Sequence, residues 1–117
     1  MGLAIEQAKI AYERGEVPIG AVVGDGSNVI AVAHNEIETR SDPTAHAEVL
    51  AIQRAAKRSS NWRLHDIVLC STLEPCTMCC GAIKLARVPV VVFGASDQRA
   101  GAFGSIYDLS IDSRSGL

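Results

Sequence analysis

Three stretches of the chain carry apolar residues at the three- and four-residue spacing of an amphipathic helix. The first covers Leu3–Arg14 and is followed by Gly15, a residue type that commonly ends helices. The second is expected over Ala45–Arg58, with bases near its C-terminal end, where the helix dipole favours positive charge. The third is expected over Pro75–Ala86, because proline is well tolerated in a first helical turn.

Short runs of β-branched residues between these helices predict strands. Ile19–Val23 and Val29–Ala33 are separated by a Gly-Asp-Gly turn and are expected to form a hairpin. Two further strands are expected at Ile67–Cys70 and Val90–Phe93, and the polar segment His34–Pro43 is predicted to be a loop. Because helices connect the later strands, we expect β-α-β crossovers and a three-layer α/β/α fold around a mixed sheet.

Length and composition fit a single domain spanning residues 1–117. Hydrophobic residues make up 48% of the chain, too many for a disordered protein, and aromatic residues only 4%, so aliphatic side chains must build the core. No apolar run approaches the roughly 20 residues of a membrane-spanning helix. The N-terminus also lacks the pattern of a secretion signal. We therefore expect a cytoplasmic protein with no membrane interaction.

The net charge of −2 argues against a protein held on nucleic acid by bulk positive charge. The bases are unevenly placed, however, because the segment from Val49 to His65 contains bases and no acid. Two interpretations stay open, a solvated helix face and a local strip of phosphate contacts. The bases of this segment are Arg54, Lys57, Arg58 and Arg63.

Candidate chemistry is concentrated in two short motifs, each at the start of a predicted helix. His46 and Glu48 are separated by one residue, and Cys76 and Cys79 by two residues. One imidazole nitrogen and two thiolates, with a fourth position open, describe a catalytic zinc site, and Glu48 is then a candidate general acid and base. Taken singly, His46 is typical of an ordinary histidine and the cysteines are typical of a redox pair. The redox interpretation does not account for His46 and Glu48.

Other reactive or aromatic residues give weaker signals. Cys70 lies in a predicted strand and is expected in the core. Cys80 projects about 100° around the helix from the preceding cysteine, so it is not expected to be a ligand. His34 has no evident partner. Trp62 is expected to pack its loop against the domain rather than to stack on a base.

The pattern H-x-E…P-C-x-x-C is the known signature of the zinc nucleobase deaminases, and through it the sequence resembles the cytidine deaminase superfamily. Within that superfamily it is most similar to the tRNA-specific adenosine deaminases. The Thr-Leu-Glu before the cysteines and the Gly-Ala-x-Gly-Ser-x-x-Asp-Leu segment point to this branch, whereas free-cytidine deaminases usually have Cys in place of His46. The matching segments are Glu16–Val22, Asp42–Glu48, Thr72–Cys79, Phe93–Ala95 and Gly101–Leu109.

The resemblance implies a cytidine deaminase-like fold and zinc-dependent hydrolytic deamination of adenosine to inosine at the wobble position of a tRNA. It implies one Zn²⁺ per chain on His46, Cys76 and Cys79, with Glu48 protonating N1 of adenine and then the leaving ammonia. It also implies a homodimer that binds the tRNA anticodon loop near its subunit interface. The substrate-binding residues that it implies are Asn35, Ala47 and Asp97.

Two other functions stay open from the sequence. A deaminase of a free base or nucleotide, such as guanine or a pyrimidine, fits the acidic net charge. A non-catalytic zinc-binding subunit would share the metal ligands, but it has no use for Glu48 beside an open metal position.

The C-terminal segment departs from the family pattern. Relatives continue past the Asp-Leu dipeptide with a further strand and a C-terminal helix, whereas residues 110–117 are polar and have no helical or strand period. We therefore expect a domain truncated at its C-terminus, which lacks that final strand and helix. The sheet should then have four strands, with Val90–Phe93 near an edge.

Overall fold

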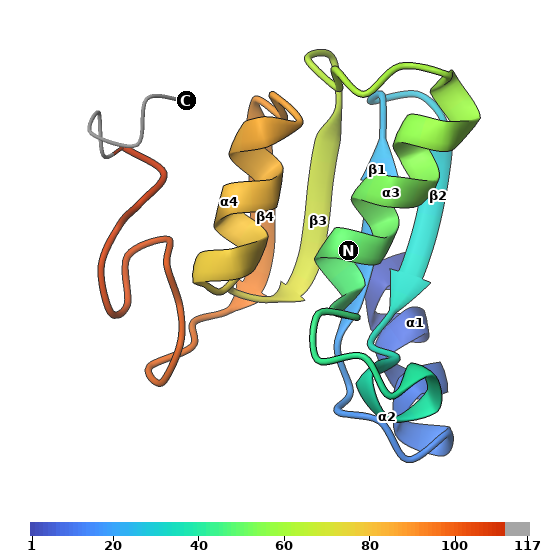
Figure 1. Ribbon diagram of the computed structural model, residues 1–117, viewed down its shortest axis with the longest axis vertical. Coiled ribbons are helices and arrows are strands. Elements are labelled where there is room, and N and C mark those ends of the chain that lie inside the picture. Colours follow the sequence, from blue (N-terminus) through green and yellow to red (C-terminus); the bar gives the residue numbers. More distant parts are fainter. Residues whose placement is uncertain (112–117) are drawn as a thin grey trace.

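The computed structural model describes residues 1–111, in which helices alternate with strands (Figure 1). The helices are α1 (Gly2–Glu13), α2 (Ile37–Arg40), α3 (Ala47–Ser59) and α4 (Thr77–Leu85). The strands are β1 (Gly20–Gly24), β2 (Val29–His34), β3 (Val68–Leu73) and β4 (Val90–Ala95). Every predicted helix and strand is present in the predicted order. The expected polar tail lies largely in residues 112–117, outside the described residues.

The strands form one mixed sheet in the order β2-β1-β3-β4. β1 runs antiparallel to both β2 and β3, whereas β3 and β4 are parallel and are connected through α4. The central position of β1 explains why Ala21 and Val23 are fully buried. The predicted mixed sheet of four strands is confirmed, and within residues 1–111 β4 is an edge strand, as expected.

Helices cover both faces of this sheet, which confirms the predicted three-layer arrangement. α3 and α4 lie side by side on one face, and α1 packs on the other (Figure 1). Leu50 of α3 and Ile83 of α4 meet Leu69 of β3 in the core between these layers. On the opposite face Gly20 permits a close approach of α1, because a Cβ there would lie 2.6 Å from the amide nitrogen of Ala8.

The structure corrects the predicted element boundaries near the candidate chemistry. α3 begins at Ala47 and α4 at Thr77, so His46 and Cys76 are N-cap residues with extended backbone rather than members of the helices. β3 continues beyond Cys70 to Leu73, because its last residues still pair with β4. Both helices and β3 therefore meet at one end of the sheet.

The segment predicted to be a loop, His34–Pro43, contains the short helix α2. The carboxylate of Glu16 accepts hydrogen bonds from the amides of Glu38 and Thr39 and from the Thr39 hydroxyl. These bonds satisfy donors that a helix start otherwise leaves unpaired. Glu16 lies 22 residues before Glu38 in the chain, so no local pattern predicts this helix.

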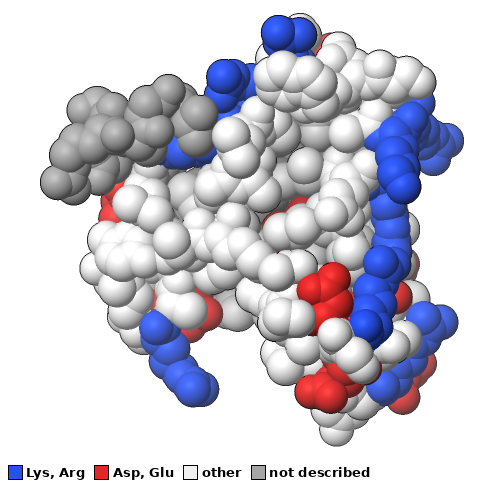
Figure 2. Space-filling model, viewed as in Figure 1, with Lys and Arg blue, Asp and Glu red and all other residues white. Residues whose placement is uncertain are grey.

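The free edge of β2 is covered by two arginines of α3. Arg54 donates to the carbonyl oxygen of Val32 at 2.9 Å, and Arg58 donates to that of Ile30 at 3.1 Å. Arg54 also forms an ion pair with Glu36 at 3.0 Å. Figure 2 shows Lys and Arg side chains gathered along this side of the molecule. Part of the basic strip therefore has a structural role in addition to any binding role.

Trp62, which was expected to pack its loop against the domain, lines a groove together with residues of α3 and α4. Trp62 is 53% exposed, and the guanidinium carbon of Arg63 lies 4.4 Å from the centre of its ring. The residues of this connection that enter the core are Leu64 and Ile67, which are 1% and 4% exposed. Among residues 1–111, no helix combines the length and the hydrophobicity that crossing a bilayer requires.

Candidate metal and catalytic site

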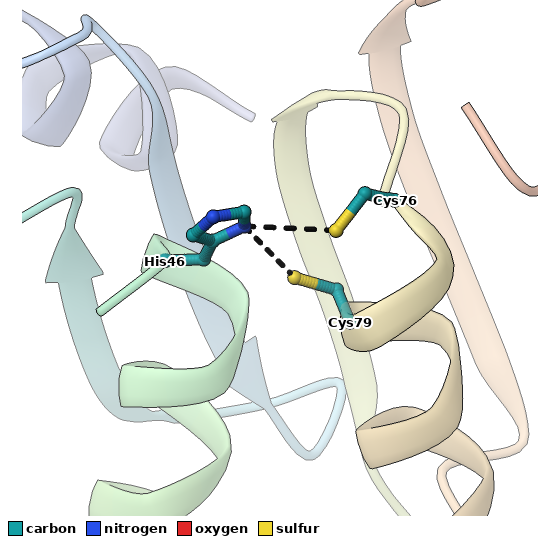
Figure 3. Close-up of side chains that lie close together, drawn as sticks. All are labelled: His46, Cys76 and Cys79. Carbon is teal, nitrogen blue, oxygen red and sulfur yellow. Dashed lines mark hydrogen bonds between the residues drawn. The ribbon is translucent and has the colours of Figure 1, made fainter. Parts of the chain in front are cut away.

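The two predicted motifs meet where α3 and α4 begin (Figure 3). His46 points from the N-cap of α3 toward α4, and Cys76 and Cys79 point back toward it from the start of α4. Nδ1 of His46 lies 3.6 Å from Sγ of Cys76 and 3.4 Å from Sγ of Cys79. All three ligand atoms lie within 4.8 Å of one another. The structure therefore brings together the three residues that the sequence predicted as metal ligands.

These separations fit a tetrahedral zinc ion. With a Zn–N distance of about 2.0 Å and a Zn–S distance of about 2.3 Å, nitrogen and sulfur ligands lie about 3.5 Å apart. Three protein ligands leave one tetrahedral position for water or substrate, as in catalytic zinc sites. Within residues 1–111 no other group of three His, Cys, Asp or Glu side chains converges in this way, and neither Cys70 nor Cys80 joins the group.

Contacts among the three side chains change their pKa values. A hydrogen bond with Cys79 lowers the pKa of Cys76 to about 4, and His46 contributes to the same effect, although partial burial opposes it. The interaction with Cys76 and burial both raise the pKa of Cys79. Cys76 likewise raises the pKa of His46, against the effect of partial burial. At neutral pH the group therefore contains a thiolate, the form of cysteine that binds metal ions.

Glu48 lies in the first turn of α3, beside this group, and is 4% exposed. Its Oε1 has no hydrogen-bond partner among residues 1–111. Burial raises the pKa of the carboxyl group, against weaker opposing effects from its own backbone amide and from Cys79. A buried ionisable group without a full set of partners destabilises the fold, and such groups are concentrated in active sites. The position of Glu48 therefore supports its predicted role in proton transfer.

Two of the predicted substrate residues lie next to the metal-ligand motif. Asn35 follows β2 and is 2% exposed, and its Oδ1 has no partner among residues 1–111. The amide of Glu36 donates to the carbonyl of Ala45 at 3.0 Å, which holds this segment against the start of α3. Ala47, the first residue of α3, is fully buried. A buried amide oxygen without a partner is suited to a hydrogen bond from a substrate.

Asp97 differs from the other predicted substrate residues because its side chain already has partners. It lies in the loop after β4, and its Oδ1 accepts hydrogen bonds from the amides of Arg99 and Ala100 at 3.0 and 3.3 Å. The side chain therefore shapes its own loop. Its contact with a substrate stays a prediction.

Glu74 is a candidate functional residue that the sequence analysis missed. Its side chain is 3% exposed, and its carboxylate accepts four hydrogen bonds from the loop after β4. Burial alone would raise the pKa of Glu74, but these bonds, led by that from the Ser105 hydroxyl, lower it to about 2. The position of an acid directly before the Pro-Cys motif is visible in the sequence and could have drawn attention to Glu74. Its partners lie 23 to 31 residues further along the chain, beyond the reach of local spacing.

His34, for which the sequence suggested no partner, has two polar neighbours in the structure. It is 7% exposed, and its Nδ1 lies 3.0 Å from the carbonyl oxygen of Asn35. Its Nε2 faces a guanidinium nitrogen of Arg14 at 3.4 Å. His34 therefore links α1 to the backbone of a predicted substrate residue.

The profile of the MafB19-like deaminase family matches residues 1–116. The chain belongs to this deaminase family. A tRNA-specific adenosine deaminase of Bacillus subtilis is 50% identical over 111 residues, which cover 95% of this chain and 69% of that protein. A tRNA-specific adenosine deaminase of Haemophilus influenzae is 50% identical over 106 residues, which cover 90% of this chain and 61% of that protein. This deaminase therefore spans between 61% and 69% of the length of these relatives.

Solved structures agree with the assignment to the deaminases. A chain from biochemical and structural studies of A-to-I editing by tRNA:A34 deaminases superposes with a TM-score of 0.87 at 45% identity, covering 90% of this chain and 81% of that chain. Guanine deaminase from Bacillus subtilis superposes with a TM-score of 0.77 at 40% identity, covering 80% of this chain and 60% of that chain. The predicted cytidine deaminase-like α/β fold is confirmed.

Proposed function

We propose that this deaminase converts adenosine to inosine at the wobble position of a tRNA by zinc-dependent hydrolysis. The observation that carries the proposal is a His/Cys/Cys ligand set with the buried carboxyl group of Glu48 beside it, whose Oε1 has no hydrogen-bond partner among residues 1–111. The choice of substrate is supported by the tRNA-specific adenosine deaminase of Bacillus subtilis at 50% identity and by the tRNA:A34 deaminase structure.

The residues of the site have separate tasks in this reaction. His46, Cys76 and Cys79 would hold one zinc ion per chain, and the bound ion would supply the Lewis acidity that makes water a usable nucleophile near neutral pH. The carboxylate of Glu48 carries protons from the attacking water to N1 of adenine and to the departing amino group. Because Glu48 is buried, these transfers take place away from bulk solvent.

Asn35 and Ala47 are the proposed contacts to the base. Enzymes of this chemistry bind a base that is turned out of its stack and recognise its edge through hydrogen bonds. The free Oδ1 of Asn35 supplies one acceptor, and the small side chain of Ala47 leaves room beside His46. Asp97, on the loop after β4, is the proposed contact to the nucleotides that flank the base.

We propose that the protein acts in the cytoplasm as a homodimer that binds the tRNA anticodon loop. A groove of about 320 Å³ on the outer side of α3 and α4 supports the dimer, because its lining is mainly apolar. Two of its lining residues, Trp62 and Leu85, are 53% and 60% exposed in the single chain. Light scattering at micromolar concentration should give twice the mass of one chain. A single-chain mass would contradict the dimer.

The test of the proposed function measures inosine in a tRNA anticodon stem-loop with adenosine at the wobble position, using zinc-loaded protein. A stem-loop with adenosine at the neighbouring position is the control, and free guanine, cytidine and adenosine are assayed in parallel. Inosine at the wobble position alone supports the proposal. Deamination of free guanine instead would support the second candidate, a guanine deaminase, which the 40% identity to the Bacillus subtilis enzyme favours over other bases.

A further inference from the structure

One buried carboxylate holds the loop after β4 over the start of α4. Glu74 accepts hydrogen bonds from the amide of Asp97 at 3.1 Å and from the amide of Phe103 at 2.9 Å. It also accepts hydrogen bonds from the hydroxyl of Ser105 and, at 3.1 Å, from the amide of that residue. The same side chain therefore fixes both ends of the segment from residue 97 to residue 105, which we call the clamp loop.

Backbone contacts place the clamp loop against the metal-ligand motif. Gly101 pairs with Cys76 in an isolated β-bridge, and the amide of Ala102 donates to the carbonyl of Pro75 at 2.9 Å. The amide of Glu74 donates to the carbonyl of Ala95 at 2.8 Å, which ties the same residue to the end of β4. The clamp loop therefore forms a wall beside one of the proposed zinc ligands.

Gly101 shows how closely the clamp loop packs on the carboxylate. A Cβ at this position would overlap Cδ and Oε2 of Glu74 and would lie 2.6 Å from the carbonyl oxygen of Asp97. Alanine at position 101 would therefore disturb the contact without changing the charge of Glu74. Gly101→Ala is therefore a second variant that should loosen the clamp loop from Glu74.

We propose that Glu74 is a positioning residue for the nucleic-acid substrate, which holds the clamp loop in the shape that substrate binding through Asp97 requires. The inference rests on the proposed function. All four bonds of the carboxylate go to the clamp loop, whereas the zinc ligands are set by the starts of α3 and α4. Without these bonds the substrate must order the clamp loop when it binds, which raises KM and leaves the chemical step nearly unchanged.

A carboxylate that only stabilises the fold would behave differently, and the chain offers a matched control. Asp25 accepts hydrogen bonds from the amides of Ser27 and Asn28, at 2.9 and 2.7 Å, in the β1–β2 turn at the far end of the sheet (Figure 1). Asp25→Asn makes the same chemical change as Glu74→Gln, away from the site. Val23→Ala, at a fully buried position of β1, is a second control that lowers stability without touching the clamp loop.

The experiment compares kcat and KM on the tRNA anticodon stem-loop for zinc-loaded wild type and variants. We expect Glu74→Gln to raise KM about tenfold or more, to keep kcat within about threefold, and to retain about one zinc per chain. Gly101→Ala should raise KM similarly, and Ser105→Ala, which removes a single donor, should raise it less. Amide exchange in the clamp loop should be faster in Glu74→Gln, whereas both controls should keep the wild-type KM.

Two results would overturn the positioning role. The first is a wild-type KM in both Glu74→Gln and Gly101→Ala, and the second is loss of zinc or of kcat without a change in KM. If Glu74→Gln does not fold, the KM values of Gly101→Ala and Ser105→Ala test the positioning role instead, and wild-type values in both would overturn it. Failure of the proposed function appears separately, as an absence of inosine with the wild-type protein, and the positioning role would then fail with it.

Discussion

Replacing Glu48 with glutamine tests two properties of this side chain at once. One is its proposed role as a proton carrier, and the other is the free-energy cost of burying it. The substitution keeps the size of the side chain and removes its ability to carry a proton. The side chain is 4% exposed and its Oε1 has no partner among residues 1–111. An unsatisfied buried polar group costs about 1–3 kcal/mol of folding free energy, and a charged group costs more. Glutamine removes the charge and can relieve part of that cost.

Stability and activity are therefore expected to respond in opposite directions. The free energy of unfolding of Glu48→Gln should be unchanged or higher by up to about 2 kcal/mol, which corresponds to a rise in Tm of up to about 8 °C for a domain of this size. The rate of deamination should fall about 10²–10⁴-fold. That loss corresponds to about 3–5 kcal/mol in the activation barrier. Zinc should be retained, because no ligand is changed.

The assay combines single-turnover inosine formation on the stem-loop with zinc analysis and urea denaturation of the metal-free proteins. Glu6→Gln, at an exposed position of α1, is the control and should leave rate and stability unchanged. A deamination rate near that of wild type would refute the acid–base role of Glu48. A loss of stability above about 1 kcal/mol would refute the inference that its buried oxygen lacks a partner.

Cys76→Ala and Cys79→Ala should each lower the zinc content from about one per chain to near zero, because two ligands hold zinc weakly; full metal content by elemental analysis would place the site elsewhere. Binding of the stem-loop should weaken with salt, with a log–log slope of about −3 for about four phosphate contacts on a single strand, and a less steep slope in Arg54→Ala/Arg58→Ala. A binding affinity that does not change with salt concentration would indicate a small-molecule substrate. Burial raises the pKa of Glu16, but hydrogen bonds from α2 outweigh it and hold the pKa below the usual 4.5, so its carboxylate stabilises the fold above that pH and loses this effect below it. The stability difference between wild type and Glu16→Gln in urea should therefore narrow between about pH 7 and about pH 3, and a constant difference would contradict this account.

The parts of the fold that sequence reasoning predicted depend on local signals. Apolar spacing predicts the helices, β-branched runs predict the strands, and a His-x-Glu and a Cys-x-x-Cys motif predict the ligands within a few residues each. The parts it missed depend on contacts between distant segments. α2 forms because Glu16 supplies acceptors from another part of the chain, and Glu74 acquires its partners only when the loop after β4 folds back. The N-cap positions of His46 and Cys76 were likewise missed, because helix starts are the least certain part of a pattern.

The arginines that cover the edge of β2 make the two edges of the sheet unequal as places where a further strand could pair. A strand that approached β2 would have to displace Arg54 and Arg58 from the carbonyl oxygens of Val32 and Ile30 and would lose these two hydrogen bonds. At the other edge β4 pairs within residues 1–111 with β3 alone, and Val90 and Val92 are 46% and 44% exposed. We therefore expect a further strand, whether from the same polypeptide or from another, to add next to β4 rather than next to β2.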